Sequence, residues 1–407
     1  MKLLLCALFI MSSSSIMAGA FKAGISTVAI TPIAHKDVVD TLHGGPKTVG
    51  NISDPLYAKT LILSDGHSRI AMINLDLMYI PPAVFSELLK DLREKNTFDQ
   101  IFLSITHSHS GYVGNNDYDA LKEKLMAGIK TANANLQAVK IGAGEGSLDE
   151  AYNRIIRHSD SGAEMLWSNP SRKKNRPVDQ SVGIINIKKE NGQTLINLVN
   201  YNAHPVITMD LHNPVISADY PGQLANSLKQ HGEGDTMFFL GAAGDVNPYD
   251  ADIKPTTLAL DRSKQLGERL ATEVFKNINT IKDYQTHGRF SVNNLTYSLP
   301  VIKKTDMETV PAEINTLLLT QDIALASFSG EFFNQFGATV KEQSPAKHTF
   351  FLGYTNGSLG YIPTNEAIKF GGYGAESKDM WFQAGTGEKQ INDAMQSLNS
   401  QYQKQIK

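Results

Sequence analysis

The chain has 407 residues, of which 41% are hydrophobic and 19% charged, and its formal net charge is −3. This composition is typical of a globular enzyme and excludes a chain that is disordered throughout. The small net charge gives no reason to expect nucleic acid or an anionic membrane as a partner. The single cysteine is Cys6, so disulfides and thiolate metal sites are excluded from the rest of the chain.

The first twenty residues have the pattern of a secretory leader. Lys2 gives a positive start, residues 3–11 form a short apolar core, and a small-residue cleavage site ends at Ala20. The apolar core is too short to span a bilayer, and no later hydrophobic segment is long enough. We therefore expect residues 1–20 to be a signal peptide, residues 21–407 to be one domain, and the protein to be secreted or periplasmic.

Strand-like apolar runs alternate with helical patterns along the rest of the chain. The expected strands are residues 70–76, 100–106, 182–187, 195–201, 236–240, 290–299, 323–328 and 349–353. The expected helices lie around residues 85–92, 121–129 and 266–274, with a short helix after residue 299 and a polar helix over residues 393–407. This alternation predicts an α/β fold, with a mixed β-sheet core flanked by helices in a single large domain.

Polar side chains follow three of these strands at the point where each strand ends. His107 and His109 follow the strand 100–106, His204 follows 195–201, and Glu331 follows 323–328. Ligands of open α/β sheets bind outside the carboxyl ends of strands, so these side chains are candidates for one site.

Two histidines and a carboxylate from separate strands, without cysteine, form the usual three-ligand set of a catalytic zinc. The alternative, that each is an isolated strand-end residue bonded to the backbone, stays open at this point. The candidate ligands are far apart in the sequence, and no H-E-x-x-H helix motif is present. A serine hydrolase is disfavoured because the chain has no G-x-S-x-G elbow.

Segments along nearly the whole chain after the leader resemble, in order, the neutral/alkaline (non-lysosomal) ceramidase family. They are Gly24–Pro32, Asp54–Lys59, Thr106–Gly111, Asn153-Arg154, Asn202–Val206, Gly244–Pro248, Gly330–Phe332 and Asn356–Thr364. The resemblance implies an α/β catalytic domain that binds one zinc ion (Zn2+) through two histidines, a glutamate and a tyrosine. It assigns these ligands to His107, His204, Glu331 and Tyr361, and Tyr361 rests on the resemblance alone.

The family hydrolyses the N-acyl amide of ceramide to a sphingoid base and a fatty acid. The resemblance therefore implies a zinc-dependent amidohydrolase that cleaves ceramide or a related N-acyl lipid with zinc-activated water. It places His109 and Arg154 beside the substrate, for carbonyl or hydroxyl recognition and proton transfer. Asp245 is a candidate for orienting a ligand imidazole. The expected partner is a lipid-like N-acyl amide, with transient contact at a membrane surface; the oligomeric state is not predicted.

Two departures from the family pattern point to an altered substrate. Asn247 stands where the family's Gly-Asp-Val-Ser-Pro-Asn segment has its serine, and Tyr249 replaces the final asparagine. Asparagine forms hydrogen bonds but is no nucleophile, so Asn247 is a candidate for positioning the substrate. The chain also stops at residue 407, so we expect no C-terminal immunoglobulin-like domain. Two other interpretations stay open: a protein of the same fold that binds an amphiphile without hydrolysing it, and a zinc hydrolase of non-lipid amides or esters.

Overall fold

The computed structural model describes residues 19–32, 37–40, 45–48, 51–111, 118–158, 162–210, 214–303 and 307–405. Most of the expected leader, with Cys6, lies outside the described residues. Gly19–Ala20 forms β1, which pairs with β18 (His287–Gly288). Within these ranges, no helix combines the length and the apolar character that a membrane-spanning segment needs.

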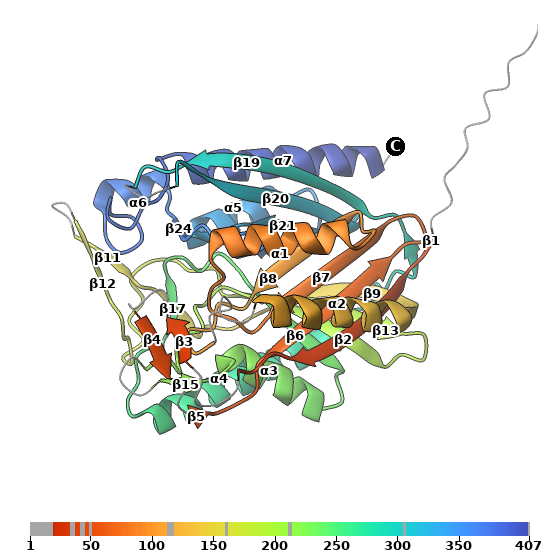
Figure 1. Ribbon diagram of the computed structural model, residues 1–407, viewed down its shortest axis with the longest axis horizontal. Coiled ribbons are helices and arrows are strands. Elements are labelled where there is room, and N and C mark those ends of the chain that lie inside the picture. Colours follow the sequence, from red (N-terminus) through yellow and green to blue (C-terminus); the bar gives the residue numbers. More distant parts are fainter. Residues whose placement is uncertain are drawn as a thin grey trace, which may run out of the picture.

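The larger of two main sheets is mixed and has eight strands (Figure 1). In spatial order they are β16 (Asp235–Leu240), β14 (Thr194–Tyr201), β13 (Ser181–Lys189), β9 (Gln137–Ser147), β2 (Lys22–Ala29), β6 (Tyr57–Ser64), β7 (Arg69–Leu75) and β8 (Gln100–Ile105). Only the two pairs at the edges, β14/β16 and β7/β8, are parallel. A crossover helix joins each pair, α3 (Asp219–Gln230) and α1 (Pro82–Glu94) respectively.

The eight-stranded sheet curls so that its two edges face each other. Strand β16 contacts both β7 and β8, although five antiparallel pairings separate the two parallel pairs. Adjacent strands are rotated against each other by roughly 20–25°, and this rotation accumulates over eight strands, so that the sheet is strongly twisted and coiled. The chain after β23 fills the space between the edges: Gly353 N donates to Leu240 O of β16, and Asn356 N donates to Leu103 O of β8. The carboxyl-terminal ends of β8, β14 and β16 therefore lie close together.

The second sheet has four strands, β19 (Ser291–Pro300), β20 (Thr309–Thr320), β21 (Ile323–Phe328) and β23 (His348–Leu352). The pair β21/β23 is parallel and is joined through α5 (Asn334–Gln343). The short helix expected after residue 299 is wrong, because residues 309–320 form β20. Val310, Ala312 and Ile314 are buried between more exposed neighbours, which is the two-residue period of a strand.

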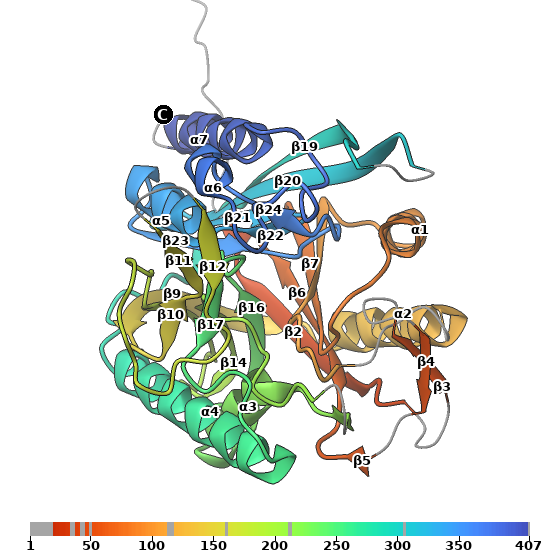
Figure 2. The ribbon, with the colours of Figure 1, turned by 90° about the vertical axis from the view of Figure 1, so that its left-hand side faces the viewer.

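The two sheets pack face to face between two layers of helices (Figure 2). Side chains of both sheets, such as Leu198 and Leu325, form the central core. Helices α1, α3, α2 (Tyr118–Ala134) and α4 (Thr256–Ile278) cover the large sheet. Helices α5 and α7 (Thr386–Gln405) cover the small one, and α7 packs through Met395 and Leu398 as expected. The mixed sheet flanked by helices in a single domain is confirmed, and the second sheet is an addition.

Short strand pairs and one short helix, α6 (Asn365–Phe370), complete the structure. The pairs are β3 (Asp37–Asp40) with β4 (Gly45–Thr48), β5 (Asn51–Ile52) with β15 (Val215–Ile216), β10 (Ala151–Asn153) with β17 (Val246–Pro248), β11 (Ile155–Arg157) with β12 (Ala163–Met165), and β22 (Glu331–Phe332) with β24 (Tyr361–Ile362). The pairs β10/β17 and β22/β24 position candidate site residues, as described below.

Candidate metal centre

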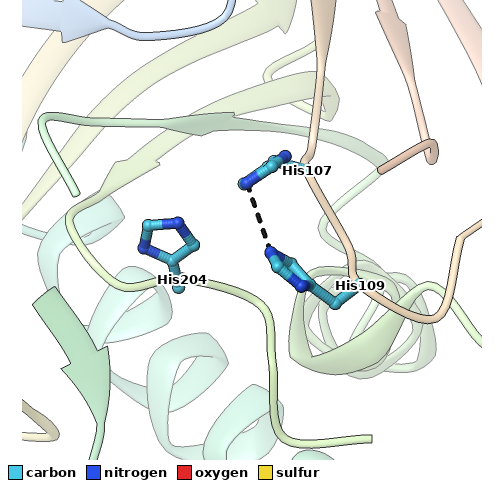
Figure 3. Close-up of side chains that lie close together, drawn as sticks. All are labelled: His107, His109 and His204. Atoms are coloured by element: carbon cyan, nitrogen blue, oxygen red, sulfur yellow. Dashed lines mark hydrogen bonds between the residues drawn. The ribbon is translucent and has the colours of Figure 1, made fainter. Parts of the chain in front are cut away.

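Three histidines from two edges of the large sheet lie together, and we call them the histidine cluster: His107, His109 and His204 (Figure 3). One ring nitrogen of each lies within 4.8 Å of the others, so the group could hold a metal ion. His107 and His109 follow β8, and His204 follows β14. His107 has a φ of 62°, an unfavourable backbone conformation for a non-glycine residue, and such strain is concentrated at functional sites.

Backbone carbonyls fix which nitrogen of two of these rings faces the cluster. Nδ1 of His107 lies 2.5 Å from Met78 O, and Nδ1 of His204 lies 3.2 Å from Val246 O. A carbonyl only accepts hydrogen bonds, so each Nδ1 carries a proton and each Nε2 is left to face the other side chains of the site. Burial, followed by the charge of Arg154, lowers the pKa of His204 to about 4, which favours the neutral imidazole that binds metals.

The carboxylate of Glu331 completes a set of converging acceptors. Its Oε2 lies 2.8 Å from Nε2 of His204 and 3.6 Å from Nε2 of His107. Burial favours its neutral form, but the imidazoles of His107 and His204 outweigh burial and hold the pKa of Glu331 well below its usual range. No lysine or arginine of the described residues forms an ion pair with it. Two imidazole nitrogens and a carboxylate oxygen that converge in this way fit a bound cation.

Tyr354 is a further residue of the candidate site that was not predicted from the sequence. Its hydroxyl donates to Oε1 of Glu331, and its ring stacks on that of His107 with centroids 4.3 Å apart. It lies in the segment between the two sheet edges and is buried. The rule that selected the histidines, a polar residue directly after a strand, also selects Tyr354, which follows the expected strand 349–353.

Tyr354→Phe is expected to weaken metal binding without unfolding the protein. The change keeps the ring over His107 but removes the hydrogen bond to Glu331, and loss of such an outer partner costs about 10- to 100-fold in metal affinity. Competition with a chromophoric chelator measures that affinity. A matched control is Tyr297→Phe, which removes a hydroxyl that donates to Asp393 at 2.7 Å, outside the site. Equal affinities of Tyr354→Phe and wild type would remove Tyr354 from the site.

Arg154, Asn247 and Tyr361 form a second group beside the histidine cluster. Pairing of β10 with β17 places Arg154 against the chain 244–247, where its guanidinium donates to Gly244 O at 2.7 Å and to Asn247 Oδ1 at 3.1 Å. The guanidinium also donates to the hydroxyl of Tyr361 at 3.1 Å. Burial opposes the charge of Arg154, but Tyr361 and then Tyr373 keep its pKa raised.

Pairing of β22 with β24 makes Glu331 and Tyr361 direct neighbours in register. Burial, and then the charge of Glu331, raises the pKa of Tyr361 well above its usual value. The phenol therefore keeps its proton in this state of the protein, and its oxygen accepts from Arg154. The structure thus brings all seven predicted site residues into one region, with Tyr361 and Asn247 held by Arg154 rather than by the histidines.

The predicted role of Asp245 in orienting an imidazole is wrong. Its Oδ2 accepts from Asn153 Nδ2 at 2.6 Å, and its Oδ1 accepts from the backbone of Asn334 at 2.7 Å. Nδ1 of His204 donates to Val246 O, so this nitrogen has no proton to donate to Asp245. Asp245 instead ties the loop after β16 to β10 and to the start of α5.

A cavity of about 240 Å³ opens beside the acceptors of this site. Glu331, Tyr354 and Tyr361 line it, together with largely apolar side chains that include Tyr79 and Phe382. A larger cavity, of about 830 Å³, is lined by Asp245, and none of Glu331, Tyr354 and Tyr361 lines it. Apolar walls with a few convergent polar groups are typical of ligand sites, so the smaller cavity is the better candidate for substrate.

The fold and site together define a two-sheet α/β protein with a buried cluster of nitrogen and oxygen donors, and comparisons with known proteins agree with this class. No family model matches the chain. Neutral ceramidase A of Dictyostelium discoideum is 24% identical over 237 residues, which are 51% of this chain and 32% of that protein. The chain thus matches about a third of the length of this curated relative.

Two solved structures share the fold. The neutral ceramidase from Pseudomonas aeruginosa aligns with a TM-score of 0.75 at 15% sequence identity, over 95% of this chain and 75% of that chain. A ceramidase complexed with C2 aligns with a TM-score of 0.76, also at 15% identity, over 94% and 75%. Sequence and structure therefore lead to the same group of proteins, and the predicted resemblance to the neutral ceramidases is confirmed.

Proposed function

We propose that this protein is a zinc-dependent amidohydrolase that cleaves the N-acyl amide of ceramide or of a related N-acyl lipid. The observation that carries the proposal is the convergence of His107, His204 and Glu331, whose Nε2 and Oε2 atoms lie close together in a buried site. The likeness to neutral ceramidases in sequence and fold supports it. We further propose that residues 1–20 are a cleaved leader and that the enzyme acts in the periplasm or outside the cell.

The residues of the site fit a zinc ion. Nitrogen and oxygen ligands from two histidines and one carboxylate form the common protein set of catalytic zinc, and Tyr361 is proposed as the further oxygen ligand. When bound, zinc would supply a Lewis acid that polarises the amide carbonyl and acidifies water.

The other side chains would handle the substrate and its protons. Nε2 of His109 lies 3.3 Å from Nε2 of His107, and its buried Nδ1 has no hydrogen-bond partner among the described residues. This ring can take a proton from water and return it to the leaving amine. Arg154 is held in place by Gly244 and Asn247, so its charge can bind a carbonyl or hydroxyl oxygen of the substrate.

Metal removal tests the proposal. Purified protein is expected to contain about one zinc ion per chain and to release fatty acid from an N-acyl sphingoid base or an N-acyl amino acid. A chelator should abolish the release, and added zinc should restore it. Elemental analysis and fatty-acid quantification provide the two readouts. Release that survives complete metal removal would contradict the zinc mechanism.

The same assay separates the two other interpretations. Zinc without release from any N-acyl compound would favour a binding protein, which the replacement of serine by the buried Asn247 makes worth testing. A panel that varies acyl length at a constant amide distinguishes a lipid substrate from a soluble one. Equal rates for acetyl and long-chain amides would favour a hydrolase of non-lipid amides.

A further inference from the structure

Trp167 is an exposed tryptophan beside the candidate site. It is 40% exposed, although tryptophan is a highly buried residue type on average. The pairing of β11 with β12 turns the chain back on itself, and the backbone of the next residue, Leu166, donates to Arg154 O at 2.7 Å. This hairpin therefore brings Trp167 back to the arginine that we propose to bind the substrate.

The indole of Trp167 lies between the charge of Arg154 and the wall of the 240 Å³ cavity. The central carbon of the Arg154 guanidinium lies 5.9 Å from the ring centroid of Trp167. The indole also meets the ring of Tyr373 edge to face, with centroids 5.5 Å apart, and Tyr373 lines the cavity. Trp167 thus places an apolar surface that water still reaches next to the cavity.

Arg154 does not need Trp167 to stay in place. Its guanidinium already donates to Gly244 O, Asn247 Oδ1 and the hydroxyl of Tyr361. A cation–π contact at 5.9 Å is close to the limit of about 6 Å for this interaction. The backbone of Trp167 is itself held, because Asn247 Nδ2 donates to Trp167 O at 3.5 Å. The exposed part of the indole is therefore available to pack against a ligand.

The cavity is too small to enclose a whole lipid. Its volume is about 240 Å³, whereas pockets that bury a drug-sized ligand measure roughly 300–1,000 Å³. A long-chain lipid with its amide bound beside Glu331 would therefore leave an apolar part outside the cavity. Contact of that part with water is unfavourable, and an aromatic surface next to the cavity would replace the water.

We propose that Trp167 is a specificity-determining residue that packs against the apolar part of the substrate outside the cavity, an inference that rests on the proposed lipid substrate. Covering the exposed part of an indole removes roughly 60–100 Å² from water, which corresponds to about tenfold or more in affinity. Trp167 therefore acts on KM, and it does so for long-chain substrates.

Trp167→Ala tests this role with N-acyl amides whose acyl chain and amine are lengthened one at a time. In at least one of the two series, KM for the longest amide should rise by about tenfold or more. For the shortest, water-soluble amide, kcat/KM should change by less than about threefold, because the hydrogen bonds of Arg154 remain. Trp167→Phe keeps an aromatic ring and should recover most of the loss. Circular dichroism should match that of wild type.

Fluorescence reports the proposed contact directly, because the chain has only two tryptophans, Trp167 and Trp381. In the variant Trp381→Phe all tryptophan emission comes from Trp167. This emission should shift to shorter wavelength when a long-chain N-acyl amide is added to chelator-treated protein, because the indole leaves water. The shortest amide, and phosphatidylcholine vesicles without any N-acyl amide, should leave the emission unchanged.

A matched control is Phe275→Ala on α4, which is 45% exposed and does not line the cavity. Its KM should equal that of wild type for every amide. Equal losses for short and long amides in Trp167→Ala would overturn the proposal and make Trp167 a support for Arg154. Unchanged KM for all amides, or an emission shift with vesicles alone, would also overturn it. An emission shift with the long-chain amide, without hydrolysis of any amide by untreated protein, would refute the proposed function and leave this inference standing.

Discussion

His204→Ala is expected to abolish the proposed metal binding and with it the proposed hydrolase activity. His204 is fully buried, and its Nε2 faces the carboxylate of Glu331 at 2.8 Å. Removal of one of the two histidines in the proposed ligand set leaves too few donors to hold zinc against water. Metal content should fall from near one to below about 0.1 ion per chain, and kcat/KM by at least about 1,000-fold.

The control for this prediction is His231→Ala, at the end of α3. Nδ1 of His231 lies 2.7 Å from Ser227 O, and His231 does not belong to the histidine cluster. This variant should keep its zinc and its activity. Because His204→Ala also leaves a cavity, circular dichroism must show that the variant is folded. A folded His204→Ala protein that still held one zinc per chain would show that the ion lies elsewhere.

Local patterns predicted most strands and helices because each pattern depends on only a few neighbouring residues. The expected strand 323–328 is β21 with the same bounds, and the apolar spacing from Phe85 to Leu92 marks the buried face of α1. Residues 309–320 were harder, because Ile314, Leu317 and Leu318 also have the spacing of a helix face. Pairing with β19 and β21 favours the strand over the helix, and a single sequence does not reveal that pairing.

The candidate site was likewise predicted only in part from the sequence. Polar residues at strand exits correctly singled out His107, His204 and Glu331 as residues that lie together. Their meeting, however, depends on the curl of the large sheet, since the strands before His107 and His204 belong to the two parallel pairs at opposite ends of the sheet. A flat sheet with the same strand order would hold these histidines apart.

The groups that orient the ligands could not be predicted at all. The carbonyls of Met78 and Val246 hold the imidazoles, and every residue has a carbonyl, so no sequence pattern distinguishes them. The erroneous assignment of Asp245 has the same origin. A carboxylate was expected to orient the imidazole, while the backbone carbonyl of the next residue, Val246, makes that contact.

Arg154→Gln is expected to reduce catalysis while the zinc stays bound. The guanidinium is buried, donates to Gly244 O, Asn247 Oδ1 and Tyr361, and makes no contact with the histidine cluster that would hold the metal. Loss of one fixed donor to a developing negative charge typically costs about 100- to 1,000-fold in kcat. We expect this loss in kcat/KM, with metal content near that of wild type.

The matched control is Arg157→Gln, three residues further along the chain. Arg157 forms an ion pair with Glu366, whose side chain is 53% exposed, and kcat/KM of Arg157→Gln should change by less than about threefold.

Arg154→Gln also leaves buried hydrogen-bond acceptors without a donor, so the free energy of unfolding of this variant should fall by about 1–3 kcal/mol in urea titrations. A kcat/KM within tenfold of wild type would remove Arg154 from catalysis, whereas loss of zinc in this variant would mean that Arg154 acts by positioning the metal ligands.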